Sequence, residues 1–505
     1  MKTLRKIAAL ALCLISIAAA ARTTATQKLL SEYAGKEPLR SGIIGVLAVR
    51  GTDTLAQVNR AIKMVPASNV KLITTGLALT KLGAGWRFRT TIAYSGHVRD
   101  SVLHGDLYIV GGGDPTTGSG RSCADPVDAT FGAWKSLLEY AGIKKIDGRI
   151  IGDGRLNSRP VTHPAWQAED LGYNYGAGVS GLNFFENTQN FRFTPGKEGA
   201  APSYSVIYPL TPWMSWTMSA TTGPAKSPNT LYCINSEFGP WGEFFGSFPS
   251  DRTGGYTFEG SNRFGAYTCA YYFYKFLDFN DIPVTGGYGD VSPRGLIRTD
   301  LLFSDIGSRA IAQDSLKVLG STVSPTLAAI VRDANVESDN FFAEALLAAM
   351  GLEIGGSTDP TTSVKAEEEI LKSIGLRPGN ACVLADGSGL SRKNYVSPEF
   401  FVRFLRKMLT SKARKPYIAS LPVPGGKGTL KYRMQNAPDD IKSRIRMKSG
   451  SMNGVRSFSG YILPAPGEAE SRTIVFSIIT NNISGPSATV GNIIDDLILS
   501  LAQEP

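Results

Sequence analysis

The chain has 505 residues, of which 42% are hydrophobic and 19% are charged, and its formal net charge is +10 at neutral pH. This composition excludes a disordered or fibrous chain, and the length allows roughly two to four domains. The 53 Lys and Arg residues form no concentrated stripe, which disfavours a nucleic-acid-binding protein. The positive charge favours contact with anionic membranes or with the acidic polymers of a cell wall.

The N-terminus has the pattern of a cleaved secretory signal. Residues 1–6 are basic, residues 7–20 form an apolar run, and small residues surround Ala20 and Ala21. The run is too short for a comfortable membrane span, so we expect residues 1–21 to be removed on export to the periplasm or beyond. The mature charge is then about +7. A retained N-terminal anchor is the alternative.

Four cysteines follow this segment: Cys123, Cys233, Cys269 and Cys382. Export permits disulfides, but the spacing matches no zinc pattern and the pairing cannot be deduced. Free buried thiols are at least as good an explanation.

The first folded region is predicted to be a helix over residues 26–34, followed by strands over residues 41–50 and 54–59. Next, Pro66 to Lys71 reads as a turn that opens an apolar helix ending near Leu82. Ser68 and Lys71 lie three residues apart, so they share one helix face. An amine beside a hydroxyl is one way to activate a nucleophile without histidine, although this pattern alone is common.

The pattern changes from Trp86 onward. Strands are predicted over residues 86–94, 107–110 and 148–153 and from 282, and helices over residues 131–141 and 267–279. The glycines at 111–113 indicate a tight turn, because the βαβ continuation of a dinucleotide-binding fingerprint is missing. Residues 160–265 are aromatic and rich in Gly and Pro, which is typical of a β-rich insertion.

Regular α/β character resumes near Ser324. The predicted helices cover residues 327–335, 341–350, 365–374, 397–408 and 488–502, and the predicted strands cover residues 444–448, 458–462 and 473–480.

Three short motifs follow one another along the chain: Ser68-x-x-Lys71, then Ser338-Asp339-Asn340, then Lys448-Ser449-Gly450. This set is typical of serine β-lactamases and penicillin-binding proteins. Competing schemes are weaker, because there is no Gly-x-Ser-x-Gly elbow, no metal-binding His spacing, and only three scattered histidines.

Acyl transfer from an amide explains the residue types. Ser68 would be the nucleophile, and Lys71 would accept its proton if burial, the helix N-terminus and Lys448 lower its pKa. Ser338 would relay a proton to the leaving amine, and Asn340 would hold Lys71 and the substrate amide.

The last motif would bind the substrate from the opposite side. Lys448 and Ser449 offer a cation and a hydroxyl to a substrate carboxylate. The backbone amides of Ser451 and Ser68 would form the oxyanion hole.

The chain resembles the low-molecular-mass class C penicillin-binding proteins, the D-alanyl-D-alanine carboxypeptidases and endopeptidases. Besides the three motifs, the resemblance rests on the runs at residues 66–71, 111–115, 386–392, 421–423 and 428–430, and on Ser451, and it covers nearly the whole mature chain. Ser338 follows Ser68 by 270 residues, far more than in a compact β-lactamase. The family usually has threonine at positions 449 and 451, and serine keeps the hydroxyl.

The resemblance implies an α/β transpeptidase-like domain, with an antiparallel sheet flanked by helices, formed by residues 22–85 and 320–505. A β-rich accessory domain would occupy residues 86–319, with a nested insert at about 180–265. It also implies that Asp170, in a Trp-x-x-x-Asp segment from Trp166, reaches the free amine of diaminopimelate in the substrate. Met452 would pack on the same side chain; an ordinary loop role for Asp170 and strand packing for Met452 are the alternatives.

We therefore expect an exported serine DD-peptidase that acts on peptidoglycan stem peptides through an acyl-Ser68 intermediate and is acylated by β-lactams. No metal or organic cofactor is implied. The sequence leaves open whether the protein forms a homodimer and whether it makes a peripheral contact with anionic membrane or wall. It also leaves open the balance of carboxypeptidase and endopeptidase activity. One alternative is a serine β-lactamase, which would need a deacylating glutamate that the sequence does not identify. The other is a non-catalytic wall-binding or sensor protein with a relic site.

Overall fold

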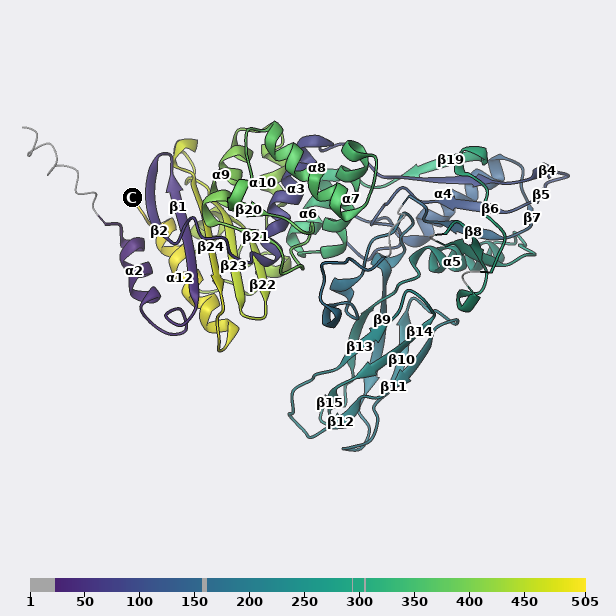
Figure 1. Ribbon diagram of the computed structural model, residues 1–505, viewed down its shortest axis with the longest axis horizontal. Coiled ribbons are helices and arrows are strands. Elements are labelled where there is room, and N and C mark those ends of the chain that lie inside the picture. Colours follow the sequence, from purple (N-terminus) through teal and green to yellow (C-terminus); the bar gives the residue numbers. More distant parts are fainter. Residues whose placement is uncertain (1–22, 157–160, 293, 304–305) are drawn as a thin grey trace, which may run out of the picture.

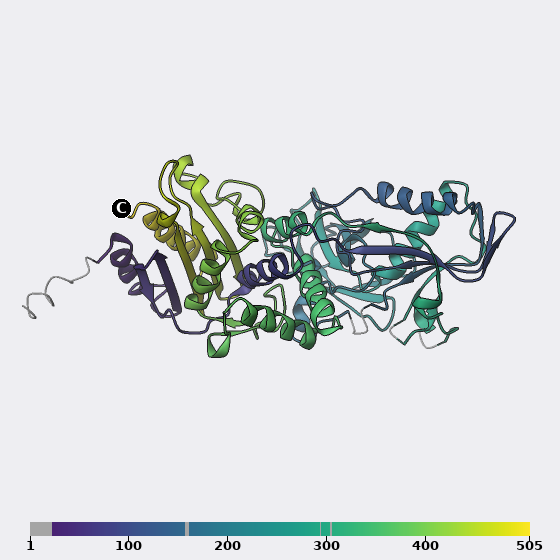
Figure 2. The ribbon, with the colours of Figure 1, turned by 90° about the horizontal axis from the view of Figure 1, so that it is seen from above.

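The computed structural model describes residues 23–156, 161–292, 294–303 and 306–505. The signal peptide predicted for residues 1–21 lies outside these residues. Two α/β bodies lie side by side along the long axis of the molecule, and a third, all-β body projects from one of them (Figure 1, Figure 2).

The first body contains a five-stranded antiparallel sheet built from both ends of the chain, in the order β2-β1-β24-β23-β22. Its strands are β1 (Ile43–Arg50), β2 (Asp53–Val58), β22 (Ile445–Met452), β23 (Val455–Ile462) and β24 (Ile474–Asn481). Helices α2 (Ala25–Ala34) and α12 (Ser487–Ala502) cover one face through a core that includes Leu30 and Ile494. β1 and β24 are buried along almost their whole length, as their continuous apolar sequence predicts.

The opposite face of this sheet packs against a group of helices. These are α3 (Val70–Lys81), α6 (Leu327–Val336), α7 (Asn340–Gly355), α8 (Pro360–Ser373), α9 (Pro398–Leu409) and α10 (Arg414–Ser420). The short helix α11 (Asp439–Arg444) leads into β22, and β20 (Cys382–Val383) pairs with β21 (Tyr395–Val396).

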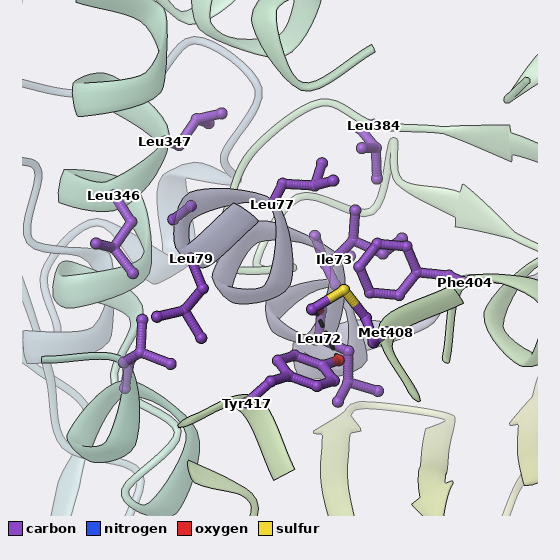
Figure 3. Close-up of a cluster of buried hydrophobic side chains, with 14 of the residues drawn as sticks. Leu72, Ile73, Leu77, Leu79, Leu346, Leu347, Leu384, Phe404, Met408 and Tyr417 are labelled. Atoms are coloured by element: carbon purple, nitrogen blue, oxygen red, sulfur yellow. Dashed lines mark hydrogen bonds between the residues drawn. The ribbon is translucent and has the colours of Figure 1, made fainter. Parts of the chain in front are cut away.

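Helix α3 runs through the middle of this core, as Figure 3 shows, between leucines of α7 and aromatic side chains of α9 and α10. Gly76 is required there, because a Cβ atom would lie 2.8 Å from the ring of Phe404. The buried hydroxyl of Tyr417 donates to the carbonyl oxygen of Leu72 over 2.9 Å. The helix that carries Lys71 is therefore fixed on all sides.

The second body has a six-stranded mixed sheet in the order β18-β17-β8-β6-β3-β19. Its strands are β3 (Arg89–Tyr94), β6 (Leu107–Val110), β8 (Ile150–Asp153), β17 (Tyr288–Val291), β18 (Ile297–Arg298) and β19 (Lys317–Val323). Helices α4 (Val127–Tyr140) and α5 (Gly265–Phe279) pack on it through Trp134 and Phe273. A small sheet of β4 (His97–Arg99), β5 (Val102–His104) and β7 (Lys145–Asp147) extends from its end.

The third body is nested between β8 and α5, and the regular elements over residues 188–261 are all strands. One sheet has the order β10 (Ser203–Tyr208), β9 (Thr188–Thr194) and β16 (Tyr256–Ser261). A second sheet has the order β11 (Ser215–Met218), β14 (Trp241–Phe245) and β13 (Tyr232–Asn235). In addition, β12 (Thr221–Gly223) pairs with β15 (Ser247–Pro249). Their inner faces enclose a core of phenylalanines at positions 191, 193, 244, 248 and 258.

The predicted fold class is confirmed: an antiparallel sheet flanked by helices, with an accessory β-rich body that carries a nested insert. The boundary expected at residue 320 falls inside β19, which pairs with β3 of the accessory sheet. We propose residues 86–323 as the accessory domain for this reason. The strand predicted from residue 282 starts later, since Val284 forms only an isolated bridge with Ile146 and β17 begins at Tyr288. Helices α10 and α11 were not predicted.

The four cysteines at positions 123, 233, 269 and 382 are free thiols. Burial raises the pKa of each thiol, so these side chains pack as small apolar groups. Among the described residues no helix has both the length and the apolar content needed to cross a membrane.

Candidate active site

Ser68 lies in a short 3₁₀ turn, residues 67–69, directly before α3, and not inside the α-helix itself. Two glycines allow other segments to approach this turn. A Cβ atom on Gly450 of β22 would lie 3.0 Å from the backbone nitrogen of Ser68, and one on Gly389 would lie 2.0 Å from the carbonyl oxygen of Ala67. The glycines in the third motif and in the 386–392 run thus let strand and loop close around Ser68.

The Nζ atom of Lys71 lies at the centre of the site. It donates to Ser68 Oγ over 3.1 Å, to Asn340 Oδ1 over 2.6 Å and to the carbonyl oxygen of Ser388 over 2.7 Å. Two of these partners can only accept hydrogen bonds, whereas the Ser68 hydroxyl can also donate. A neutral amine has two hydrogens and one lone pair, so it can bond to both acceptors and direct its lone pair at the Ser68 hydroxyl.

Burial makes this neutral form of Lys71 more accessible than in an exposed lysine. Its side chain is fully buried, and burial lowers its pKa to about 8, although the negative charges of Asp386, Asp339 and Glu344 oppose this shift. A base works best when its pKa is close to the working pH. Lys71 is therefore partly deprotonated near neutral pH and can accept a proton from Ser68.

The second motif stands at the start of α7. Ser338 has a positive φ of 59°, and Asp339 caps the helix by accepting a hydrogen bond from the Phe342 amide over 3.0 Å. The other Asp339 oxygen accepts from Arg121 Nε over 2.7 Å. Asp339 thus holds the backbone turn that directs Ser338 and Asn340 into the site.

The third motif reaches the second from β22. The buried Lys448 donates from Nζ to Ser338 Oγ over 2.8 Å and to the carbonyl oxygen of Ser449 over 2.7 Å. Burial and the charge of Lys71 both lower the pKa of Lys448. The Ser449 hydroxyl lies 3.1 Å from the Thr429 hydroxyl, so two hydroxyl groups stand together beside Lys448.

A glycine-rich loop supplies the backbone acceptor of Lys71. Glu344 of α7 accepts from the amides of Gly387 and Ser388 over 3.0 and 2.8 Å, which directs the Ser388 carbonyl to Lys71. The buried Asp386 accepts from the amides of Gly389 and Ser391 over 2.8 and 2.6 Å. The carboxylates therefore shape the loop and do not face substrate.

An open cleft of about 930 Å³ lies in front of these groups. Among the predicted site residues, those that line it are Ser68, Asp170, Ser338, Asn340, Ser451 and Met452. Burial, followed by the neighbouring Glu169, raises the pKa of Asp170, while a hydrogen bond from Tyr175 and the charge of Arg392 oppose the shift. The structure thus brings Asp170, from the accessory domain, into the same cleft as Ser68.

Contacts between the two bodies fix the Asp170 segment. Trp166 Nε1 donates to the buried Asp386 over 2.9 Å, and Ser391 Oγ donates to the carbonyl oxygen of Ala165 over 3.0 Å. Arg392 donates to Gln167 Oε1 over 3.1 Å and to the carbonyl oxygen of Asn453 over 3.0 Å. The same loop that supports Lys71 therefore also anchors the accessory wall of the cleft.

The sequence did not single out three features of this cleft: Tyr175, Arg392 and the strand β13. Tyr175 accepts a hydrogen bond from Asn340 Nδ2 at its carbonyl oxygen over 2.9 Å, and Arg392 links both walls. Arg392 could have been found as the last residue of the 386–392 run. No local pattern indicates that Tyr232 and Ile234 of β13 also line the cleft.

The chain is similar in sequence to one family of known proteins. A model of the D-Ala-D-Ala carboxypeptidase 3 (S13) family matches residues 26–240 and 303–503. A D-alanyl-D-alanine carboxypeptidase of Actinomadura sp. (strain R39) is 28% identical over 460 residues, which is 88% of this chain and 78% of that protein. The D-alanyl-D-alanine carboxypeptidase DacB of Haemophilus influenzae is 24% identical over 438 residues, covering 84% of this chain and 83% of the relative.

The crystal structure of penicillin binding protein 4 (dacB) from Haemophilus influenzae superposes with a TM-score of 0.76 at 21% identity, covering 94% of this chain and 99% of that one. At this identity the superposition shows that the fold is shared. A second structure of that protein, complexed with a β-lactam, has a TM-score of 0.69 at 19% identity and covers 94% of this chain and 98% of that one.

Proposed function

The chain belongs to the D-Ala-D-Ala carboxypeptidase 3 (S13) family of serine-type hydrolases, and we propose that it cleaves peptidoglycan stem peptides through an acyl-Ser68 intermediate. The observation that carries this mechanism is the set of three partners around Lys71 Nζ. Asn340 and Ser388 can only accept from the amine, which leaves its lone pair to the Ser68 hydroxyl. The pair therefore generates a nucleophile without histidine.

Acylation follows from this arrangement. Lys71 takes the Ser68 proton as Oγ bonds to the carbonyl carbon of the penultimate D-alanine. The developing oxyanion would accept from the amides of Ser68 and Ser451, and loss of one such donor typically costs about 10²–10³ in kcat. When the C–N bond breaks, the proton that Lys71 took from Ser68 would pass by way of the Ser338 hydroxyl to the leaving nitrogen, and Lys71 would be neutral again. Lys448 holds the Ser338 hydroxyl by a hydrogen bond. Water then hydrolyses the Ser68 ester and regenerates the free hydroxyl.

Substrate binding would use both walls of the cleft. The terminal carboxylate would lie beside Lys448 and the hydroxyls of Ser449 and Thr429, which offer it a cation and two hydroxyl donors. On the accessory wall the carboxylate of Asp170 would pair with the free amine of a diaminopimelate side chain, and Met452 would pack along its aliphatic part. A cross-link or a terminal D-alanine would be cut at the same Ser68.

We further propose that the protein acts outside the cytoplasm after removal of residues 1–21, and that penicillins acylate Ser68 as substrate mimics. A β-lactam presents a strained amide and a carboxylate with the spacing of a D-Ala-D-Ala terminus. Attack by Ser68 opens the ring, and the acyl group stays on the oxygen until water removes it.

Labelling with a fluorescent penicillin tests this function. Wild-type protein is expected to carry one stable label, and Ser68→Ala is expected to carry none. Equal labelling of both proteins would contradict the assignment of Ser68. Rapid turnover of free penicillin in place of a lasting adduct would indicate a β-lactamase, and failure to bind penicillin or to release D-alanine would indicate a relic site.

A further inference from the structure

The nested insert presents an exposed apolar face next to the catalytic cleft. On the outer face of the sheet β11-β14-β13, Tyr232 and Ile234 of β13 stand beside Trp241, Glu243 and Phe245 of β14. Their partners in register are Tyr232 with Phe245 and Ile234 with Glu243, and the rings of Tyr232 and Phe245 stack at 5.4 Å. Trp241 is 53% exposed and Ile234 is 50% exposed.

This face contributes little to the core of the insert, because the inner face of the same sheet is filled by other residues. Trp216, Cys233 and Phe244 point inward and pack against the phenylalanines of the opposite sheet. Exposed aromatic groups that a fold does not need often mark a ligand surface.

The exposed face of the β11-β14-β13 sheet adjoins the catalytic cleft. Tyr232 and Ile234 line the same cleft as Ser68, and in Figure 1 β13 lies on the side of the insert nearer to the catalytic body. A chain of contacts joins them to the Asp170 region: the ring of Tyr175 stacks on Tyr173 at 5.1 Å, and the Tyr173 hydroxyl donates to the carbonyl oxygen of Leu231 over 3.2 Å. The volume of the cleft, about 930 Å³, is at the upper end of the ~300–1,000 Å³ of small-molecule sites, so it accommodates an extended ligand.

The chemistry of the face matches a neutral carbohydrate. Aromatic faces carry partial negative charge and pack against the C–H faces of sugar rings. Around the aromatic residues stand hydroxyl and carboxylate groups, namely Ser215, Thr217 and Glu243, and Glu243 accepts a hydrogen bond from Ser219. Within the described residues of these three strands no Lys or Arg lies on this face, which disfavours an acidic polymer or a lipid headgroup.

We propose that the outer face of the β11-β14-β13 sheet is a glycan subsite, which binds the sugar chain from which the stem peptide in the cleft extends. This inference rests on the proposed function, since the stem peptide in the cleft sets where the glycan would lie. The subsite would let the enzyme distinguish a peptide attached to glycan from a free peptide of the same sequence.

The decisive experiment compares two substrates with the same pentapeptide stem, one free and one attached to its disaccharide. For Trp241→Ala we expect kcat/KM to fall about fivefold on the disaccharide substrate, the size of one aromatic stacking contact, and to change less than twofold on the free peptide. Tyr140→Ala, which removes an aromatic ring that is 94% exposed on α4, is the matched control and should leave both values unchanged. Equal losses on both substrates would mean that the face binds peptide, and no loss on either would reassign it to another macromolecule; both results overturn the proposal.

Binding without catalysis separates this proposal from the proposed function. Peptide-free glycan strands are incubated with Ser68→Ala and with Ser68→Ala/Trp241→Ala, and bound protein is measured. We expect about fivefold weaker binding of the double variant, and equal binding would overturn the proposal. If the wild type cleaves neither peptide, the proposed function fails, yet this binding comparison still decides whether the face takes glycan.

Discussion

The two walls of the cleft differ in how tightly their polar groups are fixed. On the catalytic wall Lys71 and Lys448 are fully buried and each donates to at least two acceptors between 2.6 and 3.1 Å away. On the accessory wall Asp170 is half-buried, and Tyr175 and Tyr232 are 40% and 38% exposed. The polar groups of the catalytic wall are therefore already paired, as the proposed proton transfer requires, whereas those of the accessory wall remain open to a substrate.

One loop contacts both walls of the cleft. Ser388 of the 386–392 run accepts from Lys71, while Asp386 of the same run accepts from Trp166 of the accessory domain. We therefore expect substitutions on the catalytic wall to slow acylation by every substrate, and substitutions on the accessory wall to slow acylation by only some substrates. Substitutions in the loop should slow acylation by all substrates to a small degree.

The largest effect is expected for Lys71. Lys71→Ala should slow acylation by penicillin and by peptide alike, by about 10³, within the usual range for loss of a general base. Lys71→Arg is the matched control for charge, because arginine stays protonated and cannot accept the Ser68 proton. Rapid acylation of Lys71→Arg, measured by stopped-flow labelling, would show that only the positive charge matters and would contradict the role of base.

The pH dependence of acylation should reflect the titration of Lys71 on the catalytic wall. Lysine ordinarily titrates near pH 10.5, and burial lowers the pKa of Lys71 to about 8, so the proton is lost at a lower pH than in an exposed lysine. Below pH 8 the amine is mostly protonated and cannot act as base, so the rate should rise with pH, close to tenfold per unit between pH 6 and pH 7.5, and level off above pH 8. A rate that is flat between pH 6 and pH 9 for both penicillin and peptide would contradict this assignment.

A smaller and selective effect is expected for Asp170. Asp170→Asn removes the charge and keeps the size, so kcat/KM should fall about tenfold to a hundredfold for a stem peptide with a free side-chain amine, the usual strength of a charged hydrogen bond. A stem peptide whose side chain is neutral should react at the same rate in both proteins. Glu169→Gln, which changes an exposed neighbouring carboxylate in the same cleft, is the comparison. Equal losses on both peptides would place Asp170 in the structural support of the cleft.

The smallest effect is expected for the loop that joins the walls. Trp166→Phe removes the indole donor to the buried Asp386, which should lower the free energy of unfolding by about 1–3 kcal/mol and slow acylation of all substrates a few-fold. Trp216→Phe is the matched control, because within the described structure its buried Nε1 has no hydrogen-bond partner. Denaturant unfolding and penicillin labelling measure both quantities. A larger loss for Trp216→Phe would contradict the role given to Trp166.

The catalytic wall could be read from the sequence because its chemistry is encoded in short motifs. Local patterns predict the turn, the helix starts and the strand that carry the motif residues, although Lys448 lies in the middle of β22 and not at its end. The structure brings Ser68, Lys71, Ser338, Asn340 and Lys448 together. The turn predicted before the helix is a 3₁₀ turn at residues 67–69. One detail of it was not predicted: Ala67 has a positive φ of 47°, which no propensity for this residue type would indicate.

The accessory wall was less predictable, for a physical reason. Tyr232 and Ile234 reach the cleft because the nested insert folds back beside residues 171–176, where a Cβ atom on Gly172 would lie 1.8 Å from the Cys233 carbonyl oxygen. Such a contact depends on the packing of segments far apart in the chain, and no short-range pattern specifies it. Likewise the support of Asp339 by Arg121 comes from a loop with no recognisable motif.

The release of D-alanine from a diaminopimelate-containing pentapeptide is the direct test of hydrolysis through an acyl-Ser68 intermediate. Wild-type protein should release one D-alanine per peptide, and Ser68→Ala, which removes the nucleophile but keeps Lys71 and Lys448, should reduce the rate by about 10³ or more. Release by Ser68→Ala at a rate close to that of the wild type would contradict the proposed mechanism, because hydrolysis would then proceed without an acyl-Ser68 intermediate.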